Sequence, residues 1–368
     1  MFLGRLAVDT YSFTNIKMMY YYIVFLSRRM FQFLLFFCVL SGITVASSSS
    51  FVADLDFKRK FEIWANEYHV AFKSVEHREH MFYNWMDNHA FIQRTNGLGL
   101  SFELGHNQFS GMNQTEYLQW IRGTESSPFS SGIGDNVTLG SLPSSVDWTA
   151  KNAVTPVKDQ GQCGSCWSFS TTGALEGAYA IKYGNLASFS EQQLVDCDTF
   201  GNGGKDHGCN GGLMDNAFSW ISKNGGLCSE ADYPYVSGTT KTAGNCAKTC
   251  HNVAGSAIAK FVDVQPASDL AMMTALAQQP VSVAIEADQR EFQLYKSGVF
   301  TGACGTNLDH GVLAVGYGSD AGSDYYKIKN SWSSTWGEKG YIRIGRGASY
   351  NGGKGQCGVL MQASYPLI

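Results

Sequence analysis

The 368-residue sequence lacks a strong excess of either charge. Its 27 lysine and arginine residues nearly balance 31 aspartate and glutamate residues, which leaves a formal net charge of −4 and an isoelectric point near 6.1. Nucleic-acid and anionic-membrane partners call for concentrated positive charge, so the composition gives no basis for either class. The sequence also lacks internal repeats and long low-complexity segments, and its 44% hydrophobic content is ample for the buried cores of two or three domains.

Residues 1–46 have the layout of a secretory signal peptide. The cationic "SRR" precedes the apolar stretch "MFQFLLFFCVLSGITVA", and the small residues Thr44 and Ala46 predict cleavage after Ala46. An uncleaved signal anchor is the alternative, because "YYYIVFL" lengthens the leader; Met18 and Met19 are also candidate start sites. Either route leads into the oxidising secretory pathway, with a lysosome, a vacuole or the extracellular space as the expected destination, so we expect the cysteines to pair.

Residues 51–122 are predicted to form a small helical module, and a linker follows it. Two apolar helix faces and a short strand in "LSFELGHNQF" precede a third helix, in "NQTEYLQWIRG", which Asn113 or Thr115 can cap. The helix faces consist of Phe57, Phe61, Trp64 and Tyr68, and of Phe82, Trp85 and Ile92. Residues 123–141 are rich in glycine and serine, which indicates an exposed linker. Glycosylation sequons begin at Asn113 and Asn136.

Residues 142–368 form the predicted main domain, with helices first and strands later. A long helix is expected from Cys166 to about Tyr183, a capping box at Ser190 and Gln193, and a glycine stop after "LMDNAFSWISKN". After a helix near 268–279, short β-rich runs are separated by glycine turns: "PVSVAIEA", "HGVLAVGYG", "DYYKIKNSW" and "GYIRIGRG".

The closely spaced pair Cys163 and Cys166 permits three interpretations. A redox dithiol would require a compact βαβ context and would leave the other cysteines unexplained. A zinc site would need further ligands, and the only other close pair, Cys246 and Cys250, has none beside it. The third interpretation gives the two cysteines separate roles. Of ten cysteines, Cys38 is lost with the signal, so an odd number remains and one thiol is unpaired. Cys166 begins the long helix, whose dipole favours a thiolate, and is therefore the predicted nucleophile.

The motifs "QGQCGSCWSFS", "LDHGVLAVGYG" and "KNSWSSTWGEKGY", in this order, resemble the papain family of cysteine proteases. The resemblance extends from about Leu142 to Ile368. It implies an α+β, two-lobed fold with a helical left lobe and an antiparallel β-barrel-like right lobe, preceded by a helical inhibitory prodomain.

The resemblance also implies catalytic roles. Cys166 would attack the scissile carbonyl, His310 would pair with the thiolate and protonate the leaving amine, and Asn330 would orient the imidazole under the cover of Trp332. Gln160 would donate its side-chain amide to the oxyanion, beside the backbone N–H of Cys166.

By position in the family, substrate would lie along Gly211 and Gly212. The main specificity pocket would be lined by Leu213, Met214, Ala284, Leu308, Gly311 and Gln362. This apolar pocket with a neutral residue at its base predicts a leucine, valine or aromatic side chain two residues before the cut. No insertion follows "CNGG", which favours internal cleavage.

The family pattern pairs Cys163 with Cys209 and Cys304 with Cys357, and also Cys197 with Cys246. Cys228 and Cys250 depart from the commonest pattern and would form an extra bridge, although Cys246 and Cys250 could exchange roles. Between Cys197 and Cys209 lies the long glycine-rich insert "DTFGNGGKDHG", to which the sequence assigns no function.

Residues 47–141 partly resemble the family's inhibitory pro-segment. The matching positions are Trp85, Asn88, Ile92, Asn96, Gly105, Asn107 and Phe109. Glu76 and Arg78 are out of register, and Gly111 stands where an aspartate is usual, which puts the usual acid trigger in doubt. Five of the eight histidines lie in this segment, and we hypothesise that their protonation starts maturation: His69, His77, His80, His89 and His106.

The sequence thus predicts a cysteine endopeptidase made as a secretory zymogen, without a cofactor or metal. The expected partners are peptide and protein substrates, the chain's own propeptide and cystatin-like inhibitors, and the expected state is a monomer. The alternative is a catalytically silent relative that binds peptides or inhibitors.

Overall fold

The structure is a computed structural model that describes residues 47–121 and 142–368. The predicted signal peptide, the linker and the Asn136 sequon lie outside these residues. The chain divides into two compact units, Met1–Ile63 and Trp64–Ile368. The first unit is described only by the beginning of helix α2, Ser47–Glu67. All contacts discussed below lie within the second unit.

The predicted helices of the pro-segment are present. Helix α3, Val75–Asn96, begins after Ser74, whose hydroxyl accepts a hydrogen bond from the backbone N–H of His77. Strand β1, Phe102–Leu104, and helix α4, Gln114–Ile121, follow. Asn113 rather than Thr115 caps α4, because its side chain accepts from the backbone N–H of Glu116 while Glu116 accepts from the backbone N–H of Asn113.

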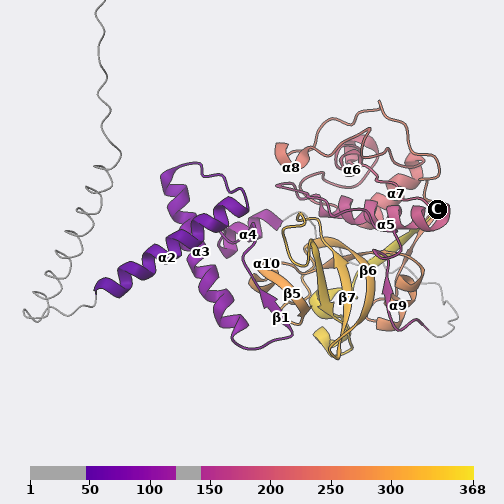
Figure 1. Cartoon of the computed structure of the whole chain (residues 1–368). Coiled ribbons are helices and arrows are strands. Elements are labelled where there is room, and N and C mark those ends of the chain that lie inside the picture. Colours follow the sequence, from indigo (N-terminus) through magenta and orange to yellow (C-terminus); the bar gives the residue numbers. More distant parts are fainter. Residues whose placement is uncertain (1–46, 122–141) are drawn as a thin grey trace, which may run out of the picture. The chain divides into compact units, whose positions relative to one another are not determined.

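The first part of the peptidase region is helical, as expected. Helix α5 spans Cys166–Tyr183, and Gly184 ends it in the left-handed conformation with φ 73°. The shorter helices are α6, Glu191–Cys197; α7, Met214–Asn224; α8, Ser237–Thr240; and the 3₁₀ turn η1, Phe200–Asn202. Figure 1 shows α5, α6, α7 and α8 gathered on one side of strands β5, β6 and β7.

One expectation about the helix starts is wrong in part. The hydroxyl of Ser190 accepts from the backbone N–H of Gln193, so Ser190 caps α6. The Gln193 side chain does not complete the capping box, because its carbonyl accepts from the backbone N–H of Cys228 instead. A tertiary hydrogen bond has replaced the local one.

The second part of the peptidase region is built on a sheet. Among the described residues the strand order is β1-β5-β8-β7-β6-β4-β9-β3, with β2 paired to β6. All pairs are antiparallel except β5 with β8. The strands are β2, Val146–Asp147; β3, Lys260–Asp263; β4, Val281–Ile285; β5, Tyr295–Phe300; β6, His310–Asp320; β7, Ser323–Lys329; β8, Tyr341–Gly345; and β9, Ala363–Leu367. The remaining helical pieces are α9, Asp269–Gln278; α10, Arg290–Gln293; and the 3₁₀ turns η2, Tyr350–Gly353, and η3, Gln356–Gly358.

Strand β6 contributes to two separate hydrophobic cores. Its residues Val312 and Ala314 belong to the core of the sheet, whereas Leu313 and Val315 belong to the core around α5, α6 and α7. This alternation follows from the two-residue period of a strand. The two lobes therefore meet at β6 and α5, where the hydroxyl of Ser170 donates to the carbonyl of Val312. The predicted two-lobed α+β fold is confirmed.

The pro-segment adds a strand to the sheet of the peptidase region. Phe102 lies opposite Gly298 and Glu103 opposite Ser297, so β1 extends the edge at β5. The side chain of Phe102 packs on Phe300, with ring centroids 4.9 Å apart. No helix in the described part of the chain has both the length and the apolar character that crossing a membrane requires.

Candidate active site

The thiol of Cys166 lies at the first residue of α5. Its side chain is fully buried, and it is the one cysteine of the described residues that is not in a disulfide. The backbone N–H of Gly311 points at its sulfur, at 3.4 Å. The hydroxyl of Ser165, the residue before the helix, makes no capping hydrogen bond. It therefore does not compete for the N–H groups of the first turn.

His310 begins β6 and immediately precedes Gly311, whose N–H contacts this sulfur. Its Nε2 lies 2.8 Å from Oδ1 of Asn330, which follows β7. Asn330 Oδ1 also accepts from the backbone N–H of Ser331, so its amide is oriented with the oxygen toward the imidazole. Nε2 therefore carries the proton of the neutral ring, and Nδ1, which has no hydrogen-bond partner among the described residues, presents its lone pair.

The ring of Trp332 covers the imidazole. The two rings stack with centroids 4.6 Å apart and planes 27° apart, and both side chains are fully buried. Burial lowers the pKa of His310 to about 4, and the hydrogen bond to Asn330 only partly offsets this effect. While His310 is buried in this way, its imidazole is neutral at every pH well above 4.

Gln160 is fixed beside the first turn of α5 by two side-chain hydrogen bonds. Its Nε2 donates to the carbonyl of Cys163 at 3.0 Å, and its Oε1 accepts from the hydroxyl of Ser331 at 2.7 Å. The backbone N–H of Gln160 also donates to the carbonyl of Ser331. The residue after Asn330 thus positions Gln160, so two of the predicted site residues are coupled through one serine.

A buried charge network behind the site was missed by sequence reasoning. Nζ of Lys158 lies 3.0 Å from the carboxylate of Glu176 and 2.6 Å from that of Glu191. The buried amine of Lys329, next to Asn330, donates to the hydroxyl of Thr155, and Glu176 accepts from that same hydroxyl. A cavity of about 20 Å³ lies among these residues and Asn330, large enough for one water molecule. The one signal in the sequence is a glutamate within the apolar helix α5.

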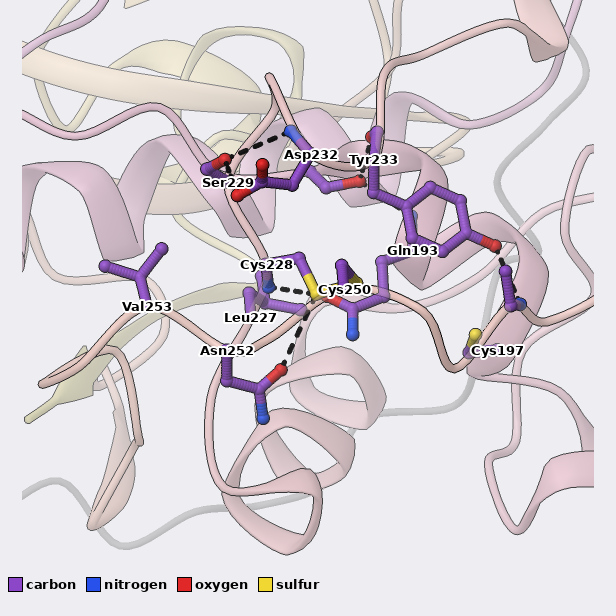
Figure 2. The surroundings of a disulfide bond; sticks show 12 residues. Gln193, Cys197, Leu227, Cys228, Ser229, Asp232, Tyr233, Cys250, Asn252 and Val253 are labelled. Carbon is purple, nitrogen blue, oxygen red and sulfur yellow. Dashed lines mark hydrogen bonds between the residues drawn. A yellow bond between two sulfur atoms is a disulfide. The ribbon is translucent and has the colours of Figure 1, made fainter.

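The described part of the structure contains four disulfides with the predicted partners, including the extra bridge that departs from the commonest family pattern. The bonds are Cys163–Cys209, Cys197–Cys246, Cys228–Cys250 and Cys304–Cys357. Figure 2 shows the surroundings of Cys228–Cys250, where Oε1 of the Gln193 side chain accepts from the backbone N–H of Cys228. The bond of Cys163 to Cys209 ties the loop before Cys166 to the segment that leads into Gly211 and Gly212.

The predicted specificity residues come together in part. Ala284 lies opposite Gly311 in the pairing of β4 with β6, and Gly311 lies against the sulfur of Met214. Leu308 packs on the same hydrophobic core as Met214 and Ala284. The backbone carbonyl of Gln362 accepts from the N–H of Ala284.

The predicted substrate strand is shaped by glycine. Gly211 has φ 117°, a region that favours glycine. A side chain at Gly212 would collide with the ring of Trp167.

Among residues 47–121 and 142–368, histidines, cysteines and carboxylates form no cluster of three that could hold a metal ion.

The pro-segment contacts the covering residue Trp332. The amide of Gln108 donates to the carbonyl of Trp332 at 2.6 Å and accepts from the hydroxyl of Thr335. The rings of Phe109 and Trp120 pack edge-on against the Trp332 ring, at 5.3 and 5.4 Å.

A second group of contacts fastens the pro-segment to α10 and its neighbours. The guanidinium of Arg290 donates to Oδ1 of Asn88, at 2.9 and 2.7 Å. Asn107 donates to the carbonyl of Gln293, and Tyr117 donates to the carbonyl of Ala287. Buried polar contacts of this kind specify one docked geometry.

Comparison with known proteins agrees with this geometry. Residues 142–367 match the family described as papain family cysteine protease, and residues 61–117 match the cathepsin propeptide inhibitor domain. The chain is 45% identical over 338 residues to "Probable cysteine protease RD21B" of Arabidopsis thaliana, covering 88% of this chain and 69% of the relative. It is 41% identical to "Senescence-specific cysteine protease SAG39" of Oryza sativa subsp. japonica, covering 89% and 95%.

Solved precursor structures are similar as well. A ragweed pollen allergen, the Amb a 11 cysteine protease in its proform, superposes with a TM-score of 0.75 at 38% identity, covering 85% of this chain and 94% of the other. A recombinant stem bromelain precursor superposes with a TM-score of 0.77 at 37% identity, covering 85% and 99%. The chain belongs to the papain family of cysteine proteases and carries that family's inhibitory propeptide.

Proposed function

We propose that the matured chain hydrolyses internal peptide bonds with Cys166 as nucleophile, His310 as proton carrier, Asn330 as orienting residue and Gln160 as oxyanion donor. The observation that carries this proposal is the position of the Cys166 sulfur, at the start of α5 and within reach of the N–H beside His310. A helix N-terminus favours the thiolate.

The reaction would proceed in two halves. The Cys166 thiolate forms a bond to the carbonyl carbon, and the oxyanion accepts from the amide of Gln160 and the backbone N–H of Cys166. His310 then gives its proton to the leaving amine as the carbon–nitrogen bond breaks. In the second half, His310 takes a proton from water, which attacks the thioester and releases the acid and the thiolate.

In the precursor this chemistry is held back by the state of His310. An ion pair needs the imidazole charged, and burial keeps its pKa at about 4. Removal of the pro-segment would expose the site, raise that pKa toward its ordinary value and permit the thiolate–imidazolium pair.

Labelling of the thiol tests the mechanism. An epoxysuccinyl or iodoacetamide reagent should label the acid-matured protein with one equivalent, and Cys166→Ser should abolish labelling, self-processing and peptide cleavage. His310→Asn should abolish cleavage, whereas His251→Asn, at an exposed histidine, should not. Normal peptide cleavage by Cys166→Ser would refute the assignment.

The specificity pocket is proposed to accept leucine, valine or an aromatic side chain two residues before the cut. The contact of Met214 with Gly311 and the pairing of Ala284 with Gly311 support an apolar wall. A peptide library should show this preference. Gln362→Glu should shift it toward arginine, because a carboxylate at the base would pair with the guanidinium. An unchanged profile in Gln362→Glu would place the base of the pocket elsewhere.

The remaining parts of the proposal concern processing and location. We place the signal peptide at 1–46, the inhibitory propeptide at 47–141 and the mature enzyme at 142–368, in a lysosome, a vacuole or the extracellular space. Glycans are proposed at Asn113 and Asn136, and monomers and cystatin-like inhibitors are expected. Amino-terminal sequencing of the secreted and matured forms, with endoglycosidase treatment, tests the boundaries and the glycans. No observation favours a catalytically silent relative.

A further inference from the structure

The glycine-rich insert between Cys197 and Cys209 brings two aspartates together in the interior. Asp198, directly after α6, is fully buried, and Asp206 is 2% exposed. The backbone N–H of Asp206 donates to the backbone carbonyl of Asp198, which brings the two buried carboxyl groups together. Two carboxyl groups can hydrogen-bond each other only if one of them carries a proton.

The hydrogen-bond donors around the pair occupy one oxygen of each carboxyl group and leave the other oxygen of each available for a proton between them. Oδ1 of Asp198 accepts from the backbone N–H of Lys205. Oδ1 of Asp206 accepts from the backbone N–H of Leu213 and from the side chain of Asn216, both at 3.0 Å. The two Oδ2 atoms are buried and receive no N–H or O–H from any other described residue.

The pair lies directly under the segment that is proposed to bind substrate. Leu213 precedes α7 and has no side-chain cap of its own, so Asp206 supplies the acceptor for its N–H. Gly212 lies between the carboxyl of Asp206 and the ring of Trp167, which is the neighbour of Cys166. The backbone of Gly211 accepts from the N–H of His207 within the same insert. A movement of Asp206 would therefore move the Gly211–Leu213 segment.

The surrounding charges favour one negative charge on the pair but oppose two. Lys205, in the insert, and Lys223, on α7, act on Asp198 and favour its ionised form, and the N-terminus of α7 faces Asp206. Two adjacent carboxylates without water would repel each other strongly.

We propose that Asp198 and Asp206 share one proton and thereby hold the Gly211–Leu213 segment in its substrate-binding position, so that loss of this proton weakens substrate binding. Asp206 is a positioning residue here, and the proposal rests on the proposed function of Gly211 and Gly212. Substrate binding thus requires a protonated group that is separate from the thiol of Cys166 and the imidazole of His310.

The direction of the pH dependence follows from the pair. Burial, and then the charge of Asp198, raises the pKa of Asp206 to about 9. The folded protein therefore keeps a proton that the unfolded chain releases near the ordinary value of 3.8. The contribution to stability is fully present below the ordinary pKa and is lost as the pH rises toward about 9.

A stability measurement tests the shared proton without any need for activity. In the full-length Cys166→Ser precursor, the thermal midpoint of the parent should fall relative to that of Asp206→Asn as the pH rises from 4 to 9. The asparagine keeps an acceptor for Leu213 and a donor for Asp198 but cannot ionise. Asp232→Asn, at an exposed aspartate whose carboxylate accepts from the hydroxyl of Ser229, should follow the parent at every pH. Parallel curves for parent and Asp206→Asn would overturn the shared proton.

Kinetics then test the link to substrate. For each matured enzyme, kcat/KM is divided by its own value at pH 5. At a pH equal to the pKa of the pair, this ratio should be about twofold lower in the parent than in Asp206→Asn, because KM rises in the parent. Asp198→Asn should behave in the same way and serves if Asp206→Asn does not fold. Identical relative KM profiles would overturn the positioning role. Failure of the matured enzyme to cleave peptides at all would instead refute the proposed function and leave the stability result standing.

Discussion

The side-chain amide of Gln108 donates a 2.6 Å hydrogen bond to the backbone carbonyl of Trp332, the residue whose ring stacks on the imidazole of His310. Gln108 also accepts from the hydroxyl of Thr335. One pro-segment side chain thus hydrogen-bonds the loop that covers the proposed proton carrier.

Gln108→Ala should weaken the hold of the pro-segment. The loss of a neutral hydrogen bond costs about 1 kcal/mol, which corresponds to about a fivefold weaker docking equilibrium. The precursor should therefore process itself faster at neutral pH, as measured by the appearance of mature protein on gels. Gln93→Ala, at an exposed glutamine on α3, is the matched control and should process at the parental rate. Equal rates for both variants would remove Gln108 from the inhibitory contact.

Gln160→Ala should reduce kcat while leaving the thiol reactive. The missing oxyanion donor is expected to lower kcat by about 10²–10³-fold, because such a donor acts mainly in the transition state. Gln162→Ala, at an exposed position of the same loop, should retain the parental kcat. Steady-state kinetics with a peptide substrate, after titration of active thiols, make the comparison. A rise in KM without a fall in kcat would assign Gln160 to substrate binding instead.

Acid activation should depend on His106 more than on the other pro-segment histidines. His106 Nε2 lies 2.9 Å from Nδ1 of His89, and its ring stacks on Trp85 at 4.5 Å. Burial, and then the charge on His89, lowers the pKa of His106 to about 3. The neutral ring of His106 stabilises the folded pro-segment above the ordinary value of 6.5, and this contribution is lost as the pH falls from 6.5 toward 3.

His106→Gln should therefore shift the midpoint of self-processing to lower pH. His69→Asn, at an exposed histidine with φ 50°, should not shift it. If His106→Gln and the parent process with the same midpoint, this histidine pair is not the trigger.

Glu176→Gln should destabilise the precursor strongly. The change leaves Lys158 and Lys329 without one of their buried countercharges, and breaking such a pair typically costs about 3–5 kcal/mol. Urea unfolding of the Cys166→Ser precursor measures this loss. Glu103→Gln breaks an exposed pair with Lys296 and should cost at most about 1 kcal/mol. Comparable losses of unfolding free energy in the two variants would show that the buried network stabilises the precursor no more than an exposed ion pair does.

The sequence by itself determined the features that depend on neighbours along the chain. The bounds of α5, its glycine stop and the strand runs follow from local periodicity and capping, which act over a few residues, whereas the choice of Asn113 over Thr115 as the cap of α4 came from the structure. The family motifs also identified Cys166, His310 and Asn330 as candidates, because each motif is a short contiguous string.

The tertiary structure alone decided which distant residues meet. The side chain of Gln193 accepts from the backbone N–H of Cys228, 35 residues away, instead of completing the local capping box. The hydroxyl of Ser331 donates to the side chain of Gln160, 171 residues away. The pairing of Asp198 with Asp206 carries the proton inference, because a charge changes its pKa only when burial removes water and brings a second charge close. Composition and spacing contain no signal for that burial.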